Sequence, residues 1–97
     1  MLPFVDQLDR QVSATPEEFA RALNAAFPGQ VEGGPEDFHV VAFGAALAVH
    51  VAAMPSRRIA SLVLPNLHVR MRFTAGDAQQ RRTLIEYLDR ATQRGGG

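Results

Sequence analysis

The chain of 97 residues contains no cysteine, no tryptophan and no lysine, and it has a single tyrosine. Without cysteine the protein has no disulfides and no thiolate chemistry, so the redox compartment is left open. The basic side chains other than histidine are all arginines, which together with the abundant alanine suggests a bacterial, high-GC coding bias. Ten arginines balance ten acidic residues. The net charge of zero therefore predicts no whole-molecule attraction to nucleic acid or to an acidic membrane.

Long apolar runs are also missing. No stretch approaches the roughly 20 apolar residues that a transmembrane helix needs, and the first residues lack the basic patch and apolar core of a secretory signal. We therefore expect, by default, a cytoplasmic protein with no membrane partner. A chain of this length is expected to form one domain, residues 1–97, that buries somewhat over ~60% of its unfolded surface.

The patterns of nucleophilic catalysis and phosphate binding are absent as well. The sequence has no G-x-S-x-G, and Gly33-Gly34 lacks the spacing and the lysine of a phosphate loop. Ser61 has no clear orienting acid, and exposed aromatic side chains for stacking on single-stranded nucleic acid are scarce. The sequence leaves enzymatic activity open but favours a role without catalysis, disfavours nucleic acid as a partner and predicts no cofactor.

What the sequence does contain is a series of alternating segments. Residues 67–74 alternate strictly between apolar and polar side chains, which predicts a half-buried strand because successive side chains point to opposite faces. Similar alternation predicts strands at about 37–43, 46–53 and 58–64. Turn-forming residues separate these runs: Gly44, Pro55-Ser56 and Pro65-Asn66.

Helical patterns flank the strands, at about 4–12, 16–27 and 77–93. Thr15 and Glu18 form a capping box around Pro16, and Asp77 and Gln80 form a second one. The element order is α-α-β-β-β-β-α. It predicts an α+β fold, a two-layer sandwich in which the helices cover one face of a four-stranded antiparallel meander.

Two-residue loops between the strands predict how the sheet residues are paired. With loops at Gly44-Ala45, Pro55-Ser56 and Pro65-Asn66, one face is apolar throughout and the outer face places His39 beside His50 and Ser61 beside Arg70. Because proline fixes φ near −65°, it cannot start a favoured two-residue hairpin turn. The registers at the two proline loops are therefore left open.

The outer face holds the candidate functional side chains, and it mixes polar with apolar groups. The apolar residues among them, including Ile59, Val63 and Val41, favour association with the same chain or with another protein, because contiguous exposed patches usually mark interaction sites. The alternative is a small anionic ligand, or a metal, bound on the same strip, since arginine forks bind carboxylate and phosphate. The candidate residues are His39, His50, Ser61, His68, Arg70 and Arg72.

Overall fold

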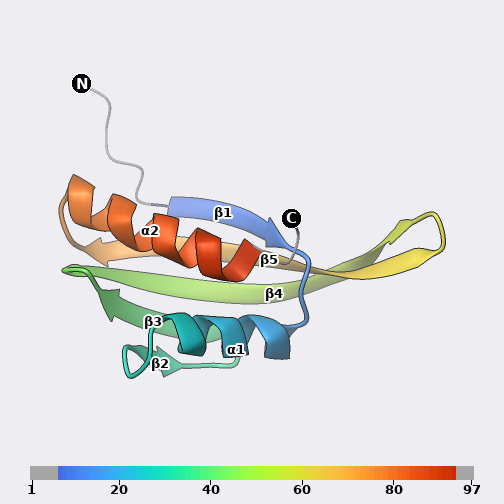
Figure 1. Ribbon diagram of the computed structural model, residues 1–97, viewed down its shortest axis with the longest axis horizontal. Coiled ribbons are helices and arrows are strands. Elements are labelled where there is room, and N and C mark those ends of the chain that lie inside the picture. The colour runs from blue at the N-terminus through green and yellow to red at the C-terminus, as the bar shows by residue number, and fades with distance from the viewer. Residues whose placement is uncertain (1–6, 94–97) are drawn as a thin grey trace.

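The computed structural model describes residues 7–93 and shows an α+β fold with one five-stranded antiparallel sheet and two helices (Figure 1). The sheet order is β1-β5-β4-β3-β2. The elements in chain order are β1 (Gln7–Val12), α1 (Pro16–Ala26), β2 (Val31–Gly33), β3 (Asp37–Ala42), β4 (Ala45–Ile59), β5 (Leu62–Ala75) and α2 (Ala78–Gln93).

Both helices begin where the capping patterns predict. Thr15 accepts a hydrogen bond from the Glu18 amide through its hydroxyl, and the Glu18 carboxylate accepts one from the Thr15 amide. Asp77 and Gln80 make the same reciprocal pair before α2. These pairs satisfy amide donors that the first turn of a helix leaves unpaired.

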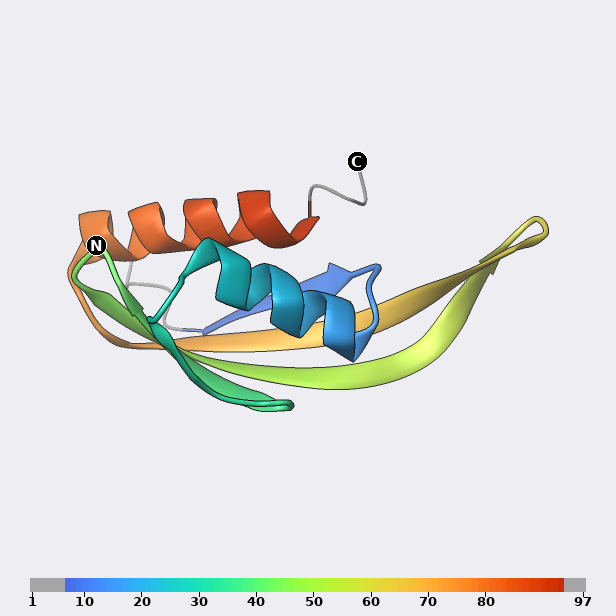
Figure 2. The ribbon, with the colours of Figure 1, turned by 60° about the horizontal axis from the view of Figure 1, so that its bottom comes forward.

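The two helices lie on the same side of the sheet (Figure 2). Their buried side chains, Phe19 and Leu23 in α1 and Leu84 and Leu88 in α2, pack on the alternate positions of the central strands. The sheet side of this core consists of Val12, Phe38, Val40, Ala42, Ala45, Leu47, Val49, Val51, Leu67, Val69, Met71 and Phe73. The opposite face of the sheet carries neither helix, so it forms the outer face that the sequence predicts.

The predicted first helix is wrong for the residues that the structure describes. Residues 7–12 form strand β1, which pairs with β5 from Gln7↔Arg72 to Val12↔Leu67; residues 4–6 lie outside the described part. Leu8 and Val12 are spaced for one face of a helix, but alternate positions of a strand place them on one face equally well. Arg10 lies between them and pairs with Asp89 of α2, with Nη2 and Oδ2 3.1 Å apart.

The first hairpin turn is also one residue earlier than predicted. Phe43 and Gly44 occupy the turn with φ of 55° and 80°, and Ala42 pairs with Ala45. Two successive positive φ values are typical of a type I′ turn, whose twist matches that of the strands. The β3–β4 register therefore shifts by two residues from the prediction, which leaves each side chain on its predicted face.

The two proline loops do not exist. β4 continues through Pro55 and β5 continues through Pro65, and the turn is at Ala60-Ser61. Pro55 and Ser56 lie opposite Pro65 alone, between the pairs Met54↔Asn66 and Arg57↔Leu64, and so form a β-bulge. A bulge tolerates proline because the ladder is interrupted there and needs no amide donor.

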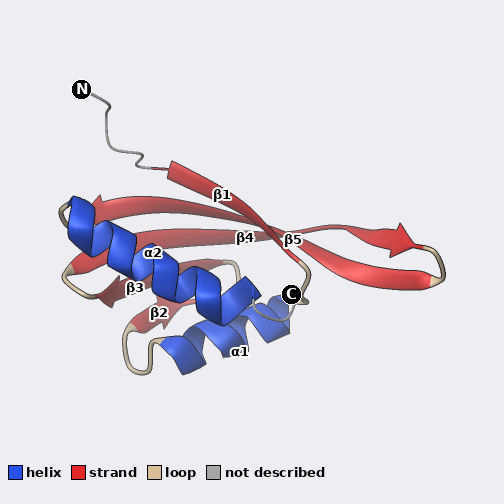
Figure 3. Ribbon diagram, turned by 45° about the horizontal axis from the view of Figure 1, so that its top comes forward, coloured by secondary structure: helices blue, strands red, loops and turns tan. Residues whose placement is uncertain are grey.

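The long hairpin extends well beyond the helices (Figure 3). β3 pairs with β4 only as far as His50, and β1 pairs with β5 only as far as Leu67. Residues 54–66, named the hairpin arm below, therefore have strand neighbours only from each other among the described residues. None of the helices in the described residues is long and apolar enough to cross a membrane.

Candidate functional site: the outer sheet face and the hairpin arm

A row of four polar side chains crosses the outer face, with a carboxylate at each end. His50 of β4 lies between Asp37 of β3 and Arg70 of β5, and Arg70 in turn lies opposite Asp9 of β1. The His50 Nδ1 and Asp37 Oδ1 atoms are 2.8 Å apart, and Arg70 Nε is 3.8 Å from Asp9 Oδ1. Since all of these groups are exposed, each contact is screened by water and contributes little to folding.

The two predicted histidine neighbours are separated. His39 lies opposite Ala48, and its Nε2 is 3.4 Å from the Thr74 hydroxyl, whereas His50 lies opposite Asp37. His68 is held elsewhere on the face by Asp9, with Nε2 and Oδ1 2.9 Å apart. Residues 7–93 contain no group of three or more side chains that could hold a metal ion. The geometry therefore gives no support to the metal alternative.

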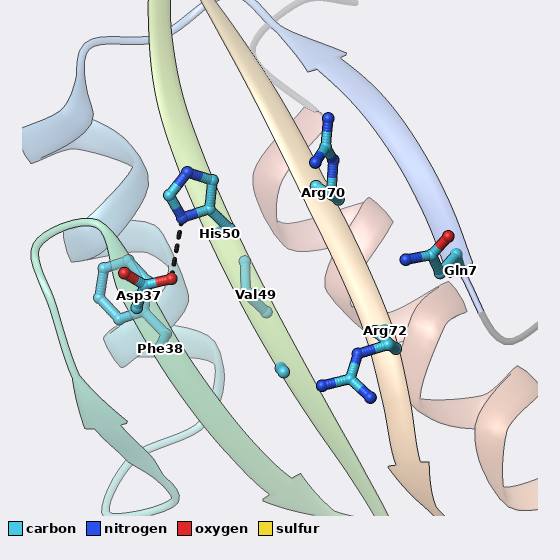
Figure 4. A pocket seen from close by; sticks show the side chains of 8 residues that line it. Gln7, Asp37, Phe38, Val49, His50, Arg70 and Arg72 are labelled. Carbon is cyan, nitrogen blue, oxygen red and sulfur yellow. Dashed lines mark hydrogen bonds and ion pairs between the residues drawn. The ribbon is translucent and has the colours of Figure 1, made fainter.

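Arg72 lies beside a shallow hollow in the outer face. Its strand neighbours are Ala48 and Gln7, and its guanidinium extends toward β4, whereas Arg70 points along β5 away from it (Figure 4). Ala48 contributes only a methyl group, which leaves a space of about 240 Å³. The hollow is lined by Gln7, Asp37, Phe38, Ala48, Val49, His50, Arg70 and Arg72. Within the described part of the chain Arg72 has no ion-pair partner.

Ser61 is far from the other candidates along the sheet. It lies in the turn at the tip of the hairpin arm, nine residues along β5 from Arg70, or about 30 Å at the rise of a strand. The predicted row His50–Ser61–Arg70 is wrong, because β4 pairs directly with β5 and places His50 opposite Arg70. Of the six candidates, His39, His50, His68, Arg70 and Arg72 share the outer face of the sheet body.

Among residues 7–93, the hairpin arm carries most of the exposed large apolar side chains. Met54, Ile59, Leu62 and Val63 are 43–60% exposed. In the sheet body, Val41 is comparably exposed on the outer face, and the half-exposed Phe43 packs edge-on against Tyr87 with ring centroids 5.4 Å apart. The apolar surface predicted for the whole outer face is therefore concentrated on the arm.

Sequence reasoning missed the carboxylates Asp9 and Asp37 as partners of histidine and arginine. Asp9 is missed because residues 7–12 also fit a helix, and Asp37 because the two-residue register shift pairs it with His50. One signal for the arm is present in the sequence. Pro55 and Pro65 stand five residues before and five after Ala60, as the two strands of one hairpin would place them.

Comparison with known proteins adds no assignment: no protein-family profile matches the chain, and the curated proteins contain no significant match.

Proposed function

We propose that the protein acts by protein–protein association and that its partner is a second copy of the same chain, bound through the hairpin arm. The observation that carries the proposal is the apolar surface of an arm that lies outside the helix-covered core. Ile59 and Leu62 lie opposite each other on one face of the arm, and each is more than half exposed. Contiguous apolar surface of this kind marks interaction sites in soluble domains.

Charge complementarity favours a second copy as the occupant. The arm carries Arg57 and Arg58 near its tip and no acidic residue, whereas Glu36 lies where the arm leaves the body, since its carbonyl accepts a 2.8 Å hydrogen bond from the Val51 amide. Glu32 lies on β2, which pairs with β3 at the edge of the sheet. None of these four side chains has an ion-pair partner among residues 7–93.

In a two-fold symmetric dimer, the apolar surface, the tip arginines and the base glutamates of both chains would each make the same contact. If two arms pack side by side in opposite directions, the tip of one arm reaches the base of the other. Arg57 and Arg58 lie six and seven residues along β4 from Val51, whose amide contacts Glu36, or roughly 20 Å. One symmetric arrangement therefore brings the tip of each arm to Glu36 of the other chain. Such an isologous contact closes on itself and gives a dimer rather than a filament.

The expected affinity is modest. Burying the exposed half of one large aliphatic side chain contributes about 1 kcal/mol, and Met54, Ile59 and Leu62 share one face of the arm, so three side chains on each of two arms contribute on the order of 6 kcal/mol. Rigid-body association costs a similar amount, an estimated 4–15 kcal/mol. We therefore expect a dimer that forms in a concentration-dependent way and in which the charge pairs contribute to specificity.

Analytical ultracentrifugation over a wide concentration range tests the proposal. The wild-type chain should pass from monomer to dimer, and the double variant Ile59→Thr, Leu62→Thr should remain monomeric, because threonine keeps the strand propensity and removes the apolar surface. Val41→Thr is the matched control: Val41 is 52% exposed and Ile59 51%, but Val41 lies in the sheet body. A wild-type monomer at every concentration would contradict the proposal.

A charge exchange distinguishes self-association from a different partner. The variant Arg57→Glu, Arg58→Glu should weaken dimerisation, and so should Glu32→Arg, Glu36→Arg. An equimolar mixture of the two variants should form a heterodimer. One contact then joins a glutamate tip to an arginine base, and the other joins an arginine tip to a glutamate base, so both contacts pair opposite charges. If the mixture associates no better than either variant alone, the arm does not bind the acidic base of a second copy.

A further inference from the structure

We infer that the hollow beside Arg72 is a binding site for the carboxylate group of a small molecule. The site lies on the sheet body and is separate from the arm: Arg72 is ten residues from Leu62 along β5, about 30 Å at the rise of a strand. Association through the arm leaves it open, so the inference does not depend on the proposed dimer.

The arrangement of donors supports an oxyanion. Arg72 extends toward β4 from one side of the hollow, and the Gln7 side chain of β1 lies on the other side of β5 from Ala48 (Figure 4). A guanidinium offers a planar fork that matches the two oxygens of a carboxylate. Since Arg72 has no ion-pair partner within residues 7–93, a bound anion would not have to displace one.

The charge balance of the lining favours one negative charge over two. Arg70 and Arg72 contribute two positive charges, and Asp37 contributes one negative charge. Asp9, next to Arg70, supplies a further negative charge just outside the hollow. The lining itself, without Asp9, carries one net positive charge, which a monovalent carboxylate neutralises. The second charge of a phosphate dianion would have no counter-charge and would be repelled by Asp37 and Asp9.

The size of the hollow sets the size of the ligand. A volume of about 240 Å³ is below the 300–1,000 Å³ typical of sites for drug-sized molecules. The methyl group of Ala48 gives the hollow a small apolar floor. The geometry therefore suits a short-chain acid whose carboxylate contacts Arg72 and whose few carbon atoms lie over Ala48.

Titration followed by ¹H–¹⁵N NMR, including the arginine Nε–H signals, tests the site in the full chain. Sodium acetate and sodium propionate are the probes, and sodium chloride at equal ionic strength is the control. We expect saturable shifts at residues 48 and 72 and at the Arg72 Nε–H, with a dissociation constant in the millimolar range, which the two charge-assisted hydrogen bonds of one guanidinium fork would provide. Identical shifts with chloride would overturn the inference.

Three variants locate the contact. Arg72→Gln should weaken acetate binding about tenfold or more, the usual size of a lost charge-assisted hydrogen bond. Arg82→Gln, which removes an exposed arginine of α2, should leave it unchanged. Ala48→Leu should weaken binding without changing the charge, because the larger side chain fills the hollow. The dispersion of the amide spectrum verifies that each variant is folded.

The remaining outcomes decide against the site or against its ligand. Unchanged binding in Arg72→Gln or in Ala48→Leu would place the anion elsewhere on the protein. Phosphate that binds more tightly than acetate at neutral pH would overturn the choice of a carboxylate. Repeating the titration with the Ile59→Thr, Leu62→Thr variant separates this site from the proposed dimer: the same acetate affinity is expected, whether or not the wild type dimerises.

Discussion

Two leucines of β5 provide the sharpest test of whether the side chains of the arm contact a partner instead of stabilising the folded monomer. Leu67 is 1% exposed and belongs to the core cluster, whereas Leu62, five residues earlier, is 60% exposed. Leu67→Ala should lower the free energy of unfolding by about 2–5 kcal/mol, as cavity-forming substitutions do. Leu62→Ala should change it by less than about 0.5 kcal/mol in the dilute monomer, because almost no packing is removed.

The same pair should behave differently as the protein concentration rises. A dimer that forms only from folded chains stabilises the wild type by mass action, by about 2.7 kcal/mol when the free partner concentration is 100 times the dissociation constant. Leu62→Ala loses this gain, so its deficit relative to the wild type should grow with concentration. The deficit of Leu67→Ala should stay nearly constant, because its arm is unchanged.

Urea unfolding followed by circular dichroism, at concentrations about a hundredfold apart, measures both deficits. A cost above about 1 kcal/mol for Leu62→Ala in the dilute sample would refute the reasoning, because it would mean that the arm side chain stabilises the monomer. A Leu62→Ala deficit that is the same at both concentrations would refute the part of the reasoning that concerns the dimer.

Two further substitutions test how the sheet is held. Arg10→Gln removes the partly buried ion pair between β1 and Asp89 of α2; it should cost about 0.5–1 kcal/mol in urea unfolding at low salt and less in 1 M NaCl, where the wild-type pair is itself screened. Gly44→Ala forces a side chain into a turn position with φ of 80° and against the amide of Gln80; it should cost about 1–2 kcal/mol and lower the melting temperature by roughly 4–8 °C per kcal/mol, as measured by calorimetry.

The two helices that the structure contains could be predicted because their signals are local. The capping boxes at Thr15 and Asp77 depend only on residues three positions apart, and the structure contains both. The apolar side chains of α1 and α2 follow the helical period, and the structure buries them against the sheet. Local hydrogen bonds and local periodicity need no knowledge of the tertiary fold.

β1 could not be predicted because its pattern satisfies two periods. Leu8 and Val12 are four residues apart, which suits one face of a helix and also one face of a strand. The tertiary fold decides between them. β5 offers an unpaired edge from Leu67 to Arg72, and β1 satisfies its backbone groups. This long-range pairing, which joins residues about 60 positions apart, leaves no trace in local propensity.

The loops predicted at Pro55 and Pro65 are wrong because proline, too, is compatible with more than one local structure. Proline commonly punctuates a sequence at turns, but it is also tolerated at a bulge and on an edge strand, where its missing amide leaves no ladder bond unmade. Pro55 and Pro65 lie in the arm, which has no neighbouring strand among residues 7–93, so both edges of its backbone are unpaired within this part of the chain. Proline at such edges opposes further strand addition. The arm is therefore better suited to contact a partner through its side chains than through continued strand pairing.

The outer face shows why the side of the sheet that a side chain occupies can be predicted more securely than the side chains beside it. Side chains alternate with a period of two, so the two-residue shift at Phe43-Gly44 kept His39 and His50 on the outer face while it replaced each one's neighbour. That replacement alters the chemistry. A pair of histidines becomes a row in which Asp37 contacts His50 and Asp9 contacts Arg70, and Arg72 beside Ala48 is left without a counter-charge in the described residues. A carboxylate ligand would supply that counter-charge, and the apolar surface that self-association would need lies instead on the arm.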